Sequence, residues 1–165
     1  MWRFEHVALV PASKQVVWQW WTDVERWPQW DTDLIESAIS GEVAVGTKGR
    51  MKVADDALIS FTISEVVPEE RFVIKVALFG AALSYTHSMV GEEDGTLKIV
   101  HGAEISGILG FVWRLLLKAK IQKTLTLALD EFARQVAVET ARLAALSPQV
   151  VPAAPVEGAA PAAEA

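Results

Sequence analysis

The chain has 165 residues, which is enough for one domain with a substantial core and too few for two sizeable domains. It contains no cysteine, which excludes a disulfide framework, thiol catalysis and thiolate metal ligands. A formal net charge of −6 argues against a nucleic-acid partner held by a basic surface. The composition is unusual in one respect: five of the seven tryptophans lie between Trp18 and Trp30.

No segment has the pattern of a targeting or membrane-spanning sequence. The N-terminus is charged where a secretory signal needs an apolar run, and the longest apolar stretch, Ile108–Trp113, is interrupted by Arg114. We therefore expect a cytoplasmic protein with no transmembrane segment, and the lack of cysteine fits that compartment. The last nineteen residues, 147–165, hold seven alanines and four prolines, which predicts a disordered tail after a domain at 1–146.

The predicted elements begin with a strand over Phe4–Val10, ended by Pro11. Ser13 is placed to cap a short helix over Lys14–Trp21, and Val24–Trp27 can form one further turn. Alternation of polar and apolar residues then predicts six strands, at Leu34–Ser40, Thr47–Val53, Leu58–Val66, Phe72–Leu78, Leu83–Val90 and Leu97–Ser106.

A long amphipathic helix, at about Leu109–Leu143, ends the series. Its apolar residues recur every three or four positions, at Trp113, Leu117, Ile121, Leu125, Ala128, Phe132 and Val136. Strands joined by short turns form an antiparallel meander, and one face of that meander needs a cover. Because this helix is the element able to supply the cover, we expect an α+β domain.

The loop that ends at Gly95 sets the register of the last two predicted strands. It places His87 directly opposite His101, and Tyr85 lies on the same inward face. No aspartate or glutamate is expected on that face. Tyr85, His87 and His101 are therefore the predicted polar groups of an apolar interior.

A concave sheet that holds one helix commonly leaves a cavity, and apolar walls with a few polar groups are typical of small-molecule pockets. The residues that we expect to contact a ligand point inward from the strands and from the long helix. They are Met51, Phe61, Ile63, Ile74, Val76, Tyr85, His87, Met89, Ile99, His101, Leu117, Ile121 and Leu125.

Four segments carry a family resemblance, namely the tryptophan-rich segment Val17–Asp31, which contains Trp-Pro-Gln-Trp-Asp, and the segments Gly41–Thr47, Asp94–Thr96 and Glu104–Gly110. In these segments the chain resembles the START-like (SRPBCC) polyketide cyclase/dehydrase and lipid-transport superfamily. The resemblance implies the helix-grip fold. In that fold a seven-stranded antiparallel sheet curls around the C-terminal helix, two short helices follow the first strand, and a hydrophobic cavity is enclosed. Members include polyketide cyclases, lipid carriers and co-chaperone domains, so the resemblance supplies no shared catalytic motif.

The tryptophan cluster has two interpretations, an aromatic lid that stacks on a ligand or a part of the core. We favour the core, because large aromatic side chains dominate core burial. Trp18, Trp21, Trp27 and Trp30 would then close the open end of the sheet, with Trp20 as the exception that faces solvent.

Three interpretations remain open for Tyr85, His87 and His101. They could act in proton transfer, with the histidines as base and acid and the tyrosine polarising a carbonyl. They could hold a metal if His6 joined them, although we expect no metal and no cofactor. They could also line the cavity and hydrogen-bond to each other, to water or to a ligand.

Cations gather near the start of the long helix. Arg114 lies near the apolar stripe and is expected to extend toward solvent. Lys118, Lys120 and Lys123 spread around the helix, and with its apolar start they suggest weak contact with a membrane surface, although a solvated face is the favoured interpretation.

Three functional hypotheses follow. The first is binding of a hydrophobic small molecule, such as a lipid, an isoprenoid or an aromatic polyketide. The second is a cofactor-independent polyketide cyclase or dehydratase, and the third is a protein-interaction or assembly module with the tail as tether.

Asp31 and Asp33 are expected to cap backbone amides rather than to form an acid–base pair. The sequence makes no prediction of oligomeric state.

Overall fold

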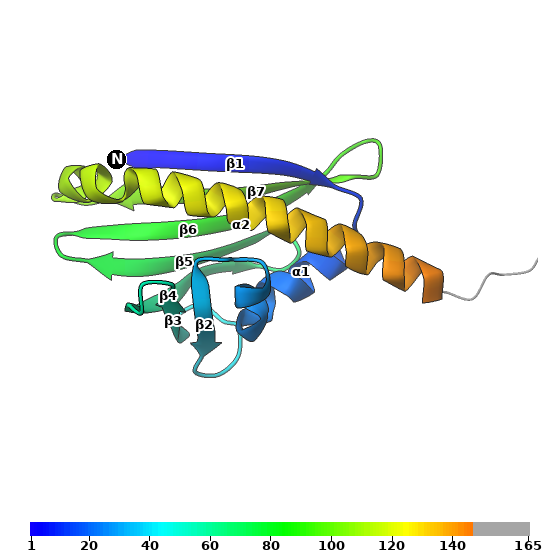
Figure 1. Cartoon of the computed structure of the whole chain (residues 1–165), viewed down its shortest axis with the longest axis horizontal. Helices are drawn as coiled ribbons and strands as arrows, with labels where there is room; N and C mark the ends of the chain where they lie inside the picture. The colour runs from blue at the N-terminus through cyan, green and yellow to red at the C-terminus, as the bar shows by residue number, and fades with distance from the viewer. Residues whose placement is uncertain (147–165) are drawn as a thin grey trace, which may run out of the picture.

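The computed structural model describes residues 1–146, and the expected tail at 147–165 lies outside the described residues. Every element that the sequence predicts is present, in the predicted order (Figure 1). The elements are β1 (Trp2–Val10), α1 (Lys14–Thr22), the 3-10 helix η1 (Val24–Gln29), β2 (Leu34–Ile39), β3 (Lys48–Val53), β4 (Leu58–Val67), β5 (Arg71–Leu78), β6 (Ala81–Gly91), β7 (Leu97–Ser106) and α2 (Gly110–Leu146).

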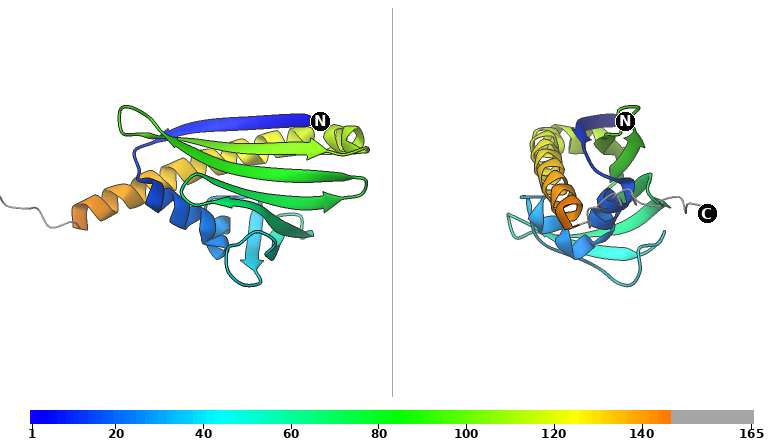
Figure 2. Two further views of the ribbon diagram at one scale, coloured as in Figure 1. Left: turned by 180° about the vertical axis from the view of Figure 1, so that it is seen from behind. Right: turned by 90° about the vertical axis from the view of Figure 1, so that its right-hand side faces the viewer.

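The seven strands form one antiparallel sheet in the order β1-β7-β6-β5-β4-β3-β2. Strands β2 to β7 form the predicted meander, and β1 pairs with β7 at its other edge. The register between β6 and β7 places His87 opposite His101, as predicted. The end-on view in Figure 2 shows the sheet curving with α2 across its open side. This confirms the helix-grip α+β fold.

Helix α2 covers the concave face of the sheet, and its second half runs over α1 and beyond the ends of the strands (Figure 1). The predicted apolar stripe is the side that packs inward. Its residues from Ile121 to Val136 are buried, whereas Trp113 and Leu117 near the start of the helix are half-buried. Within residues 1–146, no helix has both the length and the apolar character needed to cross a membrane.

Helices α1 and η1 fill one end of the space between the sheet and α2 (Figure 1). The Ser13 side chain accepts a hydrogen bond from the Val16 amide, so the predicted N-cap is confirmed. The Trp27 indole N–H donates to the Trp21 carbonyl at 3.0 Å, which ties η1 to α1. The two short helices therefore act as one plug at this end.

Trp21, Trp27 and Trp30 are buried, as predicted, but the expected solvent position of Trp20 is wrong. The Trp20 side chain is only 6% exposed and packs edge-on against Phe132 of α2, with ring centroids 6.2 Å apart. It is Trp18 that is only partly buried. The physical reason is that α1 lies between the sheet and α2, so two sides of this helix are covered.

Candidate functional site

A cavity of about 500 Å³ lies between α2 and the concave face of the sheet. The first half of α2 forms one wall, strands β3 to β7 form the opposite wall, and Trp27 and Trp30 of the η1 region close its inner end. Trp113 and Leu117 line it near the start of α2. The tryptophans therefore bound this cavity without filling it.

Nine of the thirteen residues expected to contact a ligand line this cavity, namely Met51, Ile74, Val76, Tyr85, His87, His101, Leu117, Ile121 and Leu125. Phe61, Ile63, Met89 and Ile99 do not line it. They share the inward face, but each is buried in the core, and Phe61 stacks on Trp27 with ring centroids 5.5 Å apart. Strand alternation selected the correct face, but it could not show where along that face packing ends and the cavity begins.

His87 and His101 meet at the inner end of the cavity, with ring centroids 4.5 Å apart and the rings nearly perpendicular. Both imidazoles face the same side of the sheet. The rings of Trp21 and Trp30 lie beside both histidines, at centroid distances between 5.6 and 6.2 Å. The Phe132 ring lies 5.5 Å from that of His101. The two histidines thus lie inside an aromatic cluster built from α1, the η1 region and α2.

Burial holds both imidazoles in the neutral form. Desolvation lowers the pKa of His87 to about 4, with the Phe72 carbonyl acting in the opposite direction. Desolvation also lowers the pKa of His101 well below its ordinary value, and the neighbouring His87 adds to that effect. At neutral pH each ring therefore offers one hydrogen-bond donor and one acceptor and carries no charge.

Asp31 and Asp33 line the cavity, which corrects the expectation that no acidic residue lies inside. Asp31 does cap a backbone amide, since its carboxylate accepts a hydrogen bond from the Asp33 N–H at 3.1 Å. Burial nevertheless raises the pKa of Asp31 to about 6, against the opposing effect of that hydrogen bond. The position of this pair, directly after the buried Trp30, was the sequence signal that could have placed it here.

Tyr85 lines the same cavity as these two aspartates. Burial raises the pKa of Tyr85 above its ordinary value, and the negative charges of Asp31 and Asp33 raise it further. The hydroxyl therefore stays protonated over the physiological range. It is available to the cavity as a hydrogen-bond donor.

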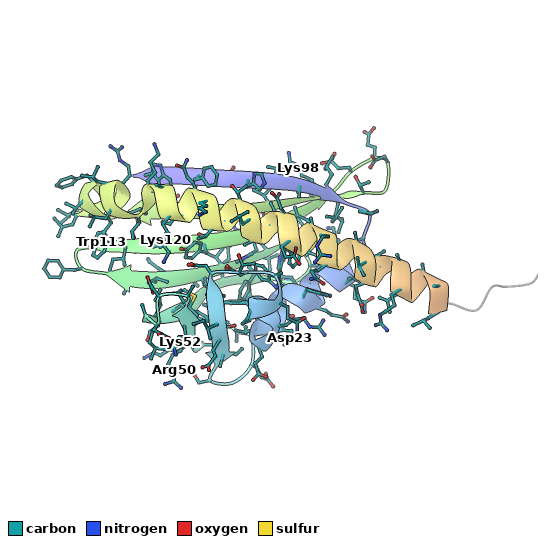
Figure 3. All side chains as sticks on the ribbon, in the orientation of Figure 1. Asp23, Arg50, Lys52, Lys98, Trp113 and Lys120 are labelled. Carbon is teal, nitrogen blue, oxygen red and sulfur yellow. The ribbon has the colours of Figure 1, made fainter. Side chains whose placement is uncertain are left out.

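Lys120 of α2 also lines the cavity (Figure 3), although the sequence analysis placed it among the cations of a solvated helix face. Its ammonium group lies 3.6 Å from a carboxylate oxygen of Asp33 and 3.3 Å from one of Asp55. The lysine thus joins α2 to the chain before β2 and to the turn after β3. Its position between Leu117 and Ile121, on the inward stripe of the helix, could have indicated this role.

The conditions for a metal site are not met. His6 lies opposite His101 in the sheet, but its ring nitrogen Nε2 lies 3.0 Å from a carboxylate oxygen of Asp130 on α2. Within residues 1–146, no three histidine, aspartate or glutamate side chains are grouped so that they could hold a metal ion. Arg114 is exposed, as expected, and does not line the cavity.

A family model described as polyketide cyclase/dehydrase and lipid transport matches residues 1–137. The chain belongs to this family. The match confirms the superfamily that the sequence motifs indicate. No curated protein matches the sequence of this family member.

Solved structures of low sequence identity share the fold of this polyketide cyclase/dehydrase and lipid-transport family member. A protein from Nitrosomonas europaea gives a TM-score of 0.66 at 12% identity, covering 84% of this chain and 96% of its own. A protein from Thermus thermophilus gives a TM-score of 0.65 at 14% identity, and the match covers 84% of this chain and 99% of that protein. Norcoclaurine synthase from Thalictrum flavum, solved in complex with dopamine and hydroxybenzaldehyde, gives a TM-score of 0.62 at 15% identity. The match covers 82% of this chain and 86% of that protein.

Proposed function

We propose that the protein binds a hydrophobic small molecule, such as a lipid, an isoprenoid or an aromatic polyketide, in the cavity between the sheet and α2. The observation that carries this proposal is the cavity, whose volume of about 500 Å³ lies within the range of small-molecule pockets. Its walls are mainly aliphatic and aromatic. Burial of a ligand's apolar surface, at about 25 cal/mol per Å², supplies the affinity.

The polar groups at the inner end orient the ligand. Trp30 Nε1, His87 Nδ1 and His101 Nε2 are buried and have no hydrogen-bond partner within the part of the chain that the structure describes. Buried polar atoms are almost always paired, so unpaired ones call for a partner. Side chains around the inner end close these three atoms off from the cavity. In this proposal a ligand hydroxyl that reaches the inner end displaces those side chains and supplies the partner.

The charge state of these residues favours binding over the enzymatic alternative in which His87 and His101 exchange protons with a substrate. A base with a pKa of about 4 has little tendency to take a proton at neutral pH. In this proposal both histidines, together with Tyr85, are therefore hydrogen-bonding groups.

The test is titration with N-phenyl-1-naphthylamine, an uncharged apolar probe whose fluorescence rises in apolar sites. Val76 lines the cavity, so the larger side chain in Val76→Trp occupies the space that a ligand needs. We expect the wild-type chain to bind the probe and Val76→Trp to bind it at least tenfold more weakly. Val7→Trp is the matched control, because Val7 is 46% exposed on the outer face of β1.

Circular dichroism at the same temperature checks that both variants are folded. Equal affinity of Val76→Trp and Val7→Trp for the probe would contradict binding in this cavity. So would a wild-type chain that does not bind the probe at all.

A further inference from the structure

Five large apolar side chains are exposed together at the end of the molecule where α2 begins. They are Phe79, Ile108, Phe111, Leu115 and Leu116, each at least 65% exposed, and we call them the apolar end surface. Soluble proteins seldom leave so many large apolar side chains exposed side by side, and such patches mark interaction sites.

The apolar end surface is one connected feature. Phe111 and Leu115 are four residues apart, so they lie on one side of the start of α2, and Ile108 is in the turn directly before the helix. Phe79 is in the two-residue turn between β5 and β6, and its carbonyl accepts a hydrogen bond from the Trp113 indole N–H at 2.9 Å. The turn is therefore fixed against the helix. In Figure 3 the labelled Trp113 lies at this end of α2.

These side chains have no role in the core, because the opposite side of the same helical turns packs inward. Trp113 and Leu117 occupy that inward side and line the cavity. The start of α2 thus has two apolar sides, one facing the cavity and one facing outward.

Charge indicates what covers the outward side. No acidic residue occurs between Glu104 and Asp130, although the chain as a whole has a net charge of −6. Arg114, Lys118 and Lys123 lie in this segment, are exposed, and have no ion-pair partner among residues 1–146. A helix with an outward apolar side flanked by unpaired cations is suited to the interface of an anionic bilayer. A second copy of this chain is disfavoured, because a two-fold contact would bring the same cations together.

We propose that the apolar end surface docks on an anionic lipid membrane, with Phe79, Phe111 and Leu115 inserted at the interface and Arg114, Lys118 and Lys123 against the headgroups. Docking places the cavity wall formed by Trp113 and Leu117 next to the bilayer. This goes beyond ligand binding and does not depend on it.

Co-sedimentation with extruded vesicles tests the proposal. We expect the full chain to bind vesicles of phosphatidylcholine and phosphatidylglycerol at 3:1, and to bind pure phosphatidylcholine at least tenfold more weakly. Phe111→Ser/Leu115→Ser should reduce partitioning to the anionic vesicles by at least tenfold. Leu9→Ser/Val90→Ser, two exposed apolar positions elsewhere in the sheet, should leave it unchanged.

The electrostatic part is tested separately. Arg114→Gln/Lys118→Gln/Lys123→Gln should lower partitioning to the anionic vesicles on the order of 100-fold, since each cation near an anionic surface contributes about fivefold. The matched triple variant Lys14→Gln/Lys75→Gln/Lys98→Gln should bind as the wild type does. Circular dichroism checks that each variant is folded.

Three results would overturn the proposal. One is a wild-type chain that stays in solution with the anionic vesicles at low ionic strength. Another is equal partitioning of Phe111→Ser/Leu115→Ser and the wild type. The third is a wild-type dimer in light scattering that this double variant converts to a monomer, which would assign the surface to self-association.

Discussion

Neutral imidazoles determine what the inner end of the cavity offers to a ligand. His87 and His101 are 8% and 2% exposed and are enclosed by aromatic rings. Protonation of either ring would place a cation in an environment that desolvates it, and the second imidazole lies too close to tolerate a second charge. The pair is thus suited to hydrogen bonding with an uncharged ligand oxygen.

The buried histidines make stability depend on pH. Their folded pKa values lie below the value of about 6.5 that they take in the unfolded chain, so below pH 6.5 the unfolded state binds more protons. Their contribution to stability is complete above pH 6.5 and is lost as the pH falls from there toward 4. Between pH 8 and pH 5 we expect a loss of about 2 kcal/mol for each histidine.

Asp31 changes stability in the opposite direction as the pH falls. Its pKa of about 6 makes the folded state bind more protons than the unfolded state between about pH 4 and pH 6. Urea unfolding is therefore best measured on Asp31→Asn, which removes the titrating carboxyl and retains an oxygen for the Asp33 amide. We expect its unfolding free energy to fall by about 4 kcal/mol from pH 8 to pH 5. An unchanged free energy over this range would show that the histidines are accessible to protons in the folded state.

Among the elements, the plug formed by α1 and η1 depends on close contact with the sheet. Trp27 of η1 stacks on Phe61, and Phe61 in turn covers Gly49 of β3. A Cβ atom at Gly49 would overlap the Phe61 ring. This glycine therefore allows the aromatic stack to lie close to the strand.

Gly49→Ala is expected to destabilise the protein by about 1–3 kcal/mol, because the Phe61 and Trp27 rings must shift to make room. Gly91→Ala is the control, since a Cβ atom at Gly91, at the end of β6, meets no atom within 4 Å. Urea unfolding followed by tryptophan fluorescence measures both. Equal stabilities for the two variants would mean that the contact between Phe61 and β3 is looser than the structure shows.

The strands and their inward faces could be predicted from the sequence, because side chains alternate strictly along a strand. The opposition of His87 and His101 followed from one loop length and is confirmed. The burial of Trp20 could not be predicted from α1 alone. It depends on Phe132, more than 100 residues later, which covers a second side of that short helix.

The polar part of the cavity was harder to predict than its apolar walls. Asp31 and Asp33 belong to a segment between η1 and β2 that has no periodicity, so nothing local indicates which way their side chains point. Lys120 reaches Asp33 and Asp55 only because α2 crosses the sheet at this place. These contacts are set by tertiary packing.

For the whole molecule, the sheet and the plug enclose only part of the space beside α2. The middle of the helix, up to Val136, packs on the core, whereas the first half forms a cavity wall on one side and carries the apolar end surface on the other. Figure 1 shows this first half at the end of the sheet opposite α1. The architecture thus separates a closed, tryptophan-lined end from an end whose exterior is apolar and cationic.

Native mass spectrometry of the chain purified from its natural host tests the central claim, a ligand held in the cavity, most directly. The account predicts a population heavier than the chain by one hydrophobic small molecule, present in the wild type and in Val7→Trp and lost in Val76→Trp. The contradicting result is a wild-type chain that shows only its own mass, even after incubation with a lipid extract of that host.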